Sequence, residues 1–172
     1  MTDRLLKILL NDIRFLAPII STVSVFLFAA EYTNRDRWLT RRRVAGLFAV
    51  HAVTLVLVWT NPVHGLVRQG VALADTTGFV LMDIEWGPWY YVHAAYSYTL
   101  LVAAAWMLVD KLHQSGDVGT YRGQSLTILI AQLIPWGMNA AFIAGLTEID
   151  FTALVFTVTG AMFAVALFRY QI

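Results

Sequence analysis

Five long apolar stretches, each nearly free of charge in its interior, constrain the fold of this chain more than any other feature. We expect helices over residues 13–32, 43–60, 88–109, 124–145 and 151–169. A hydrocarbon core of about 30 Å takes roughly 20 helical residues to cross, so each stretch can span a membrane. Backbone polar groups in lipid must be paired within the chain, and the stretches lack the alternation of a transmembrane β-strand. The sequence therefore predicts an all-α integral membrane protein, a five-helix bundle that forms one domain over residues 1–172.

The composition argues against a soluble enzyme. The chain is 59% apolar and 13% charged, whereas a soluble domain is roughly 45–50% apolar and about 25% charged. Zero cysteines exclude disulfides, Cys-ligated zinc and iron–sulfur clusters. No nucleophile–base motif, phosphate loop or metal-ligand spacing is visible. We therefore expect no enzymatic activity, no cofactor and no nucleic-acid partner.

The basic residues predict an orientation. The end of the bundle that holds the connection between the first two helices carries eight of the twelve Lys and Arg: Arg35, Arg37, Arg41, Arg42, Arg43, Lys111, Arg122 and Arg169. The other end carries Arg4, Lys7, Arg14 and Arg68, with residues 1–12 as an outer connection. The positive-inside rule therefore predicts a multi-pass protein of the cell membrane, with its N-terminus outside and its C-terminus in the cytoplasm.

The only long connection, residues 61–87, is expected on the outer side and is not polar. Turn-forming residues at 75–78 separate two segments rich in β-formers, and apolar Val80, Met82, Ile84 and Trp86 alternate along the second segment. We expect a short extracellular β-hairpin between the second and third helices. It would serve as a plug that shields helix ends, as a lid over a pocket, or as both.

Polar side chains on two helices predict a ligand pocket in the outer half of the bundle. Trp89, His93 and Tyr96 have the spacing of one helical face, and Gln132 and Asn139 lie seven residues apart on the fourth helix. His93 and Asn139 lie at matching depths, roughly 8–9 Å below the outer surface. The alternative is interhelical hydrogen bonding that holds the bundle together without a ligand. The expected lining is His64, Trp89, His93, Tyr96, Gln132 and Asn139, with Asp83, Glu85 and Trp86 at the rim.

Haem ligation by His51 and His93 is a competing hypothesis. Counted from opposite surfaces, the two residues differ in depth by roughly 10 Å. Because two axial ligands must lie level with each other, this estimate disfavours haem.

Several short strings, taken in order, carry a family resemblance. The strings are Glu31-Tyr32-Thr33-Asn34-Arg35, Thr60-Asn61-Pro62, Gly87-Pro88-Trp89-Tyr90, Tyr121-Arg122, Asp150-Phe151-Thr152 and Leu167-Phe168-Arg169-Tyr170. The set resembles the N-terminal seven-transmembrane input region of membrane sensor histidine kinases, especially those of haloarchaea and some bacteria. The resemblance implies that the chain matches this region from its third helix onward, and that the kinase output domain is absent from these 172 residues.

The expected function is a membrane-embedded sensory or receptor module of a two-component system. It would bind a small or lipidic ligand in the outer half of the bundle and signal to a cytoplasmic output. The alternative is a non-signalling membrane subunit that holds a partner protein or a quinone-like molecule. The lipid bilayer and the unidentified ligand are the expected partners, with a homodimer or a cytoplasmic signalling partner left open.

Overall fold

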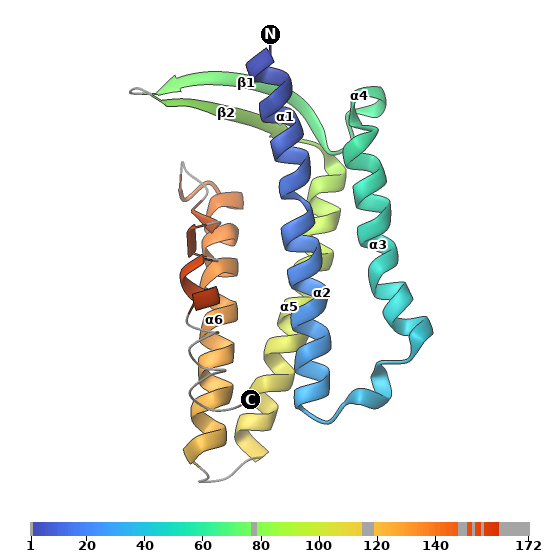
Figure 1. Cartoon of the computed structure of the whole chain (residues 1–172), viewed down its shortest axis with the longest axis vertical. Helices are drawn as coiled ribbons and strands as arrows, with labels where there is room; N and C mark the ends of the chain where they lie inside the picture. The colour runs from blue at the N-terminus through green and yellow to red at the C-terminus, as the bar shows by residue number, and fades with distance from the viewer. Residues whose placement is uncertain are drawn as a thin grey trace. The chain divides into compact units, whose positions relative to one another are not determined.

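The structure is a computed structural model that describes residues 2–76, 79–114, 119–147, 151, 152, 154, 155 and 157–161. It divides into two compact units, Met1–Ala104 (unit 1) and Ala105–Ile172 (unit 2), which we describe separately. Its elements are α1 (Thr2–Arg14), α2 (Leu16–Tyr32), η1 (Asp36–Trp38), α3 (Arg41–Trp59), α4 (Asn61–His64), β1 (Arg68–Thr76), β2 (Phe79–Trp86), α5 (Pro88–Gln114) and α6 (Gly119–Ile143) (Figure 1).

Among the described residues, four segments are long and apolar enough to cross a membrane. They are Leu6–Tyr32, Arg41–Trp59, Pro88–Gln114 and Leu126–Ile143. Of the fifth expected stretch, residues 152, 154, 155 and 157–161 are helical, residue 151 is described but not helical, and the rest lies outside the described residues. The count of five helices and the single transmembrane domain therefore stay predictions.

The N-terminal residues, which the sequence suggested as an outer connection, are helical in the structure, and their position on the outer side stays a prediction. α1 begins at Thr2, and a single turn residue, Phe15, separates it from α2. Pro18 explains the interruption, because it has no N–H to donate to the carbonyl of Arg14, four residues earlier. The same proline lies in the first turn of α2, where a missing N–H costs no bond within that helix.

The predicted β-hairpin is confirmed. β1 and β2 pair antiparallel from Arg68 opposite Trp86 to Thr76 opposite Phe79. Within unit 1, the hairpin lies at the same end as the N-terminus (Figure 1). Thr77 and Gly78, in the expected turn, lie outside the described residues.

Backbone contacts fix the start of α5 against the loop that precedes β1. The Gly87 N–H donates to the Val67 carbonyl (2.8 Å), and the Trp89 N–H donates to the Leu66 carbonyl (3.0 Å). A Cβ at position 87 would overlap the Leu66 carbonyl, so this close approach requires glycine. The first turn of α5 is therefore held level with the loop.

A small aromatic and aliphatic core lies at the hairpin end of unit 1. Phe15, Val58 and Val67 are buried, and Trp86 and Tyr90 are among the side chains packed against them. The Trp86 and Tyr90 rings stack with centroids 4.1 Å apart, and the rings of Phe15 and Trp86 form a T-shaped contact with centroids 6.2 Å apart. This core joins the turn between α1 and α2, the end of α3, the hairpin and the start of α5.

Candidate functional site: a polar seam between two helices

Three polar contacts join α3 to α5 on successive turns. Trp89, His93 and Tyr96 form the face of α5 that the sequence singled out, and each of them bonds to α3. The bonds run from Trp89 Nε1–H to Thr54 Oγ1 (3.0 Å), between His93 Nε2 and His51 Nδ1 (3.0 Å), and from the Tyr96 hydroxyl to the Leu47 carbonyl oxygen (2.9 Å). We call these six residues the α3–α5 seam. Because Leu47, His51 and Thr54 are spaced by four and three residues, they also share one face of α3.

The two histidines form the centre of the seam. His51 is 1% exposed and His93 is 6% exposed, and their ring centroids lie 5.1 Å apart. Of the two nitrogens that meet, one must donate a proton and the other must accept it. The accepting nitrogen therefore carries no proton, so at least one of the two histidines is neutral. Within the part of the chain that the structure describes, His51 Nε2 is buried without a hydrogen-bond partner. His51 therefore keeps an unused polar atom at the centre of the seam.

Aromatic rings surround the histidine pair. The ring of Tyr96 lies 5.3 Å from that of His51, and the ring of Phe15 lies 6.4 Å from that of His93. The histidine pair is therefore buried beside aromatic rings. A buried hydrogen bond in such surroundings is strong while it is made and costly to leave unmade.

The estimate that His51 and His93 differ in depth by roughly 10 Å is wrong, since the two rings are in contact. The estimate rests on the assumption that the end of α3 and the start of α5 lie level with each other at the outer membrane surface. In the structure the first turn of α5 lies level with Thr54, more than one turn before α3 ends at Trp59. A directly bonded pair is also not arranged as the two axial ligands of a haem, which lie on opposite sides of the iron. Among the described residues, no group of three His, Asp or Glu side chains could hold a metal ion.

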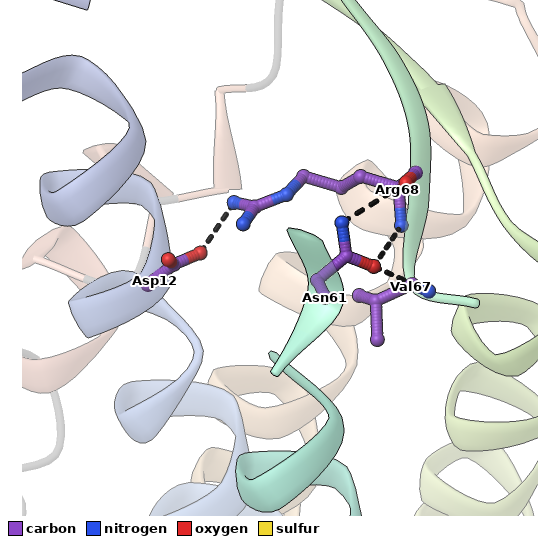
Figure 2. Close-up of polar contacts among 4 residues, drawn as sticks. All are labelled: Asp12, Asn61, Val67 and Arg68. Atoms are coloured by element: carbon purple, nitrogen blue, oxygen red, sulfur yellow. Dashed lines mark hydrogen bonds and ion pairs between the residues drawn. The ribbon is translucent and has the colours of Figure 1, made fainter. Parts of the chain in front are cut away.

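A second polar cluster, the hairpin junction, ties α1, α4 and β1 together (Figure 2). Asn61 Oδ1 accepts from the N–H groups of Val67 (2.9 Å) and Arg68 (3.0 Å), and Asn61 Nδ2 donates to the Arg68 carbonyl (3.0 Å). The Arg68 guanidinium pairs with the Asp12 carboxylate, and the two side chains are 5% and 11% exposed. The hairpin junction consists of Asp12, Asn61, Val67 and Arg68.

The other candidates in unit 1 have varied surroundings. Trp86 is half-buried against Tyr90. His64 is exposed, and its ring bonds to the Thr60 hydroxyl (3.0 Å) and accepts from the Leu66 N–H (3.0 Å), so it stabilises the turn at α4. Asp83 lies opposite Ala72 in the hairpin, and its side chain is outside the described residues.

The two candidates on α6 belong to unit 2. Gln132 is buried and Asn139 is half-buried. His93 belongs to unit 1, and the expected approach of Gln132 and Asn139 to it stays a prediction.

The α3 half of the seam is not among the residues predicted from the sequence, where His51 enters only as a candidate haem ligand and Thr54 has no role. The sequence does carry a signal for both, because His51, Thr54 and Val58 have the spacing of one helical face. In the structure all three are buried.

Comparison with known proteins agrees with the resemblance. No curated protein and no solved structure matches the chain. The profile of the family described as the N-terminal 7TM region of histidine kinase matches residues 1–172. In that family the region is the sensory input part, not the catalytic part. The chain therefore belongs to the N-terminal seven-transmembrane region of histidine kinases, a multi-pass membrane sensory input module.

Proposed function

We propose that this input module binds a small or lipidic ligand at the hairpin end of unit 1 and passes the binding on through the α3–α5 seam. The observation that carries the proposal is the buried hydrogen bond between His51 and His93, 3.0 Å long, which links two membrane-spanning helices directly. A bond between side chains on separate helices can be exchanged for a bond to a ligand. The seam thus offers a ligand a direct way to change helix packing.

The surroundings of His93 suit a mainly apolar ligand. Trp86, Trp89 and Tyr90 pack around the hairpin-end core, and His93 lies one turn further along α5. Ligand sites are typically lined by apolar and aromatic side chains with a few polar groups that fix orientation. We assign that orienting role to His93 and to the indole N–H of Trp89.

Ligand binding changes helix packing only if the two packings bind the ligand differently. A ligand group that bonds to His93 or Trp89 competes with His51 or Thr54 for the same nitrogen. Hydrogen bonds between membrane helices contribute about 0.6 kcal/mol on average and up to about 1.7. A modest difference in ligand affinity is therefore enough to open the seam. The far ends of α3 and α5 would carry the change toward the predicted cytoplasmic side.

Native mass spectrometry of the detergent-purified chain, with an absorption scan of the same sample, tests ligand binding. We expect a stoichiometric adduct on the 19.3 kDa protomer, lost in His93→Ala and in Trp89→Phe. Val92→Ala is the matched control, since Val92 is exposed beside His93 on the same helix, and it should keep the adduct. A bare wild-type chain, or an adduct that survives both seam variants, overturns the proposed site.

Distance measurements between spin labels test signalling. The chain has no cysteine, so Arg41→Cys at the start of α3 and Val102→Cys midway along α5 give one label each at an exposed position. The label-to-label distance should change when detergent exchange removes the adduct. An unchanged distance would instead favour the non-signalling membrane subunit.

A further inference from the structure

A second candidate site lies at the opposite end of α3 from the hairpin. An open pocket of about 340 Å³ is lined by Phe26 of α2, Trp38 of η1, and Arg43, Gly46 and Leu47 of α3. Its volume lies within the range of about 300–1,000 Å³ that is typical of ligand pockets. A Cβ at position 46 would meet no atom within 4 Å, so glycine leaves the wall of α3 open at this point.

The pocket lies beside a strongly basic connection. Residues 31–43 hold five arginines, three of them consecutive at 41–43, against the two acidic residues Glu31 and Asp36. Arg37, Arg41, Arg42 and Arg43 are exposed. In the part of the chain that the structure describes, no carboxylate pairs with Arg43. All five basic residues are arginine, whose planar guanidinium matches the oxygen pair of a phosphate better than a lysine ammonium does.

The level of the pocket matches the boundary between membrane and water. The connection between α2 and α3 separates two membrane-spanning segments, Leu6–Tyr32 and Arg41–Trp59. Trp38 is 38% exposed there, as expected of an indole ring at a membrane interface. The apolar wall of the pocket is therefore at the level of lipid chains, and its arginine is at the level of lipid headgroups.

We propose that this pocket binds an anionic phospholipid, with one acyl chain between Phe26 and Leu47 and the headgroup phosphate on Arg43. Basic pockets beside membrane helices are known to bind acidic lipid headgroups, and each arginine near a membrane surface contributes roughly fivefold in affinity. Charge complementarity selects this occupant over a neutral lipid, and the apolar wall selects it over a free phosphate.

The proposed lipid would contact Leu47, which is also part of the α3–α5 seam. The side chain of Leu47 lines the pocket, and its carbonyl accepts the Tyr96 hydroxyl at 2.9 Å. The site is distinct from the proposed ligand site at the hairpin end, so the two proposals can fail independently.

Native mass spectrometry of the full chain from nanodiscs tests the proposal, with phosphatidylglycerol compared with phosphatidylcholine of the same acyl chains. We expect the wild-type chain to retain phosphatidylglycerol selectively. The affinity for this lipid should be about fivefold lower in Arg43→Gln, and it should be lower still in Gly46→Leu, because the leucine side chain fills the pocket. Arg43→Lys keeps the charge and should retain an intermediate amount. His93→Ala should leave this lipid in place.

The matched control is Arg37→Gln, which removes the same charge from a residue that does not line the pocket. Equal losses in Arg37→Gln and Arg43→Gln would mean diffuse attraction to the basic connection and would overturn the site. Equal retention of the two lipids would also overturn it, as would a Gly46→Leu variant that melts like the wild type and still keeps phosphatidylglycerol.

Discussion

The hairpin junction and the α3–α5 seam are both buried polar clusters in unit 1, but they are built differently. In the hairpin junction one side chain, Asn61, makes three hydrogen bonds to the backbone of a single loop. In the seam each α5 side chain makes one bond to α3, and His51 keeps an unpartnered nitrogen among the described residues.

This difference separates a structural cluster from one that can switch. Backbone partners in a short loop cannot be exchanged without unfolding the loop, so the hairpin junction fixes the position of β1. Side-chain partners on two helices can be exchanged by a change of rotamer or by a small shift of one helix. Fully satisfied networks make a structure rigid. We therefore expect the hairpin junction to govern stability and the seam to govern response.

The largest effect should come from breaking the ion pair of the hairpin junction. Arg68→Met leaves the Asp12 carboxylate buried without its cation. Removing one partner of a buried pair typically destabilises a protein by about 3–5 kcal/mol. We expect a large fall in the midpoint temperature of thermal unfolding in mild detergent. The fluorescence of the six tryptophans measures this unfolding.

The double variant Asp12→Leu with Arg68→Met is the control for this prediction. It removes both charges, and replacing a whole buried pair by apolar side chains is often nearly neutral. Recovery of most of the lost stability would assign the effect to the uncompensated charge. If Arg68→Met unfolds at the wild-type midpoint, the hairpin junction is not the stabilising element that we infer.

The next effect should come from Asn61. Asn61→Ala leaves two N–H groups and one carbonyl of the loop without their partner, and unsatisfied buried groups cost about 1–3 kcal/mol each. Part of this cost would be relieved by water, so we expect on the order of 2–3 kcal/mol. The loop before β1 should also become sensitive to protease. Asn61→Asp keeps the oxygen that accepts from Val67 and Arg68, and it should lose clearly less.

These two clusters also show what the sequence could predict. The spans, the hairpin and the face of Trp89, His93 and Tyr96 follow from periodicity over many residues. Within the described residues, the structure contains four of the five expected spans, the hairpin and this face. The hairpin junction depends on single residues that meet across long separations: Asp12 and Arg68 are 56 positions apart. Composition and spacing carry no signal for such a pair, and Arg68 was counted only as one basic residue on the outer side.

The histidine pair was missed for a different reason. Both residues were identified, but their relative depth was inferred from the membrane surfaces and not from the loop that joins their helices. The contacts of Gly87 and Trp89 with Val67 and Leu66 draw the start of α5 down beside Thr54. Depths counted in residues from a predicted helix end are uncertain, because the end itself is not predicted precisely. Such a count does not reveal that α5 begins one or two turns below the end of α3.

A double-variant cycle on His51 and His93 tests whether the seam is only weakly coupled to stability. His51→Leu and His93→Leu each leave one imidazole without its partner, so each should cost about 1–2 kcal/mol. The double variant should regain the pairwise part, about 0.6–1.7 kcal/mol. Unfolding by SDS titration in mixed micelles measures all four proteins. A coupling energy as large as that of the ion pair would make the seam a structural cluster, contrary to our assignment.

Tyr96→Phe should have the smallest effect on stability and sharpens the comparison most. It removes only the hydroxyl that donates to the Leu47 carbonyl, and the phenyl ring keeps its place beside His51. A helical carbonyl can keep its bond within the helix, so the loss should be about 0.5 kcal/mol. The spin labels on α3 and α5 should nevertheless report a broader distribution of distances, because the variant lacks the seam bond that lies nearest to the labelled positions. A variant with unchanged stability and an unchanged distribution would show that the seam ends at the histidine pair and does not reach Leu47.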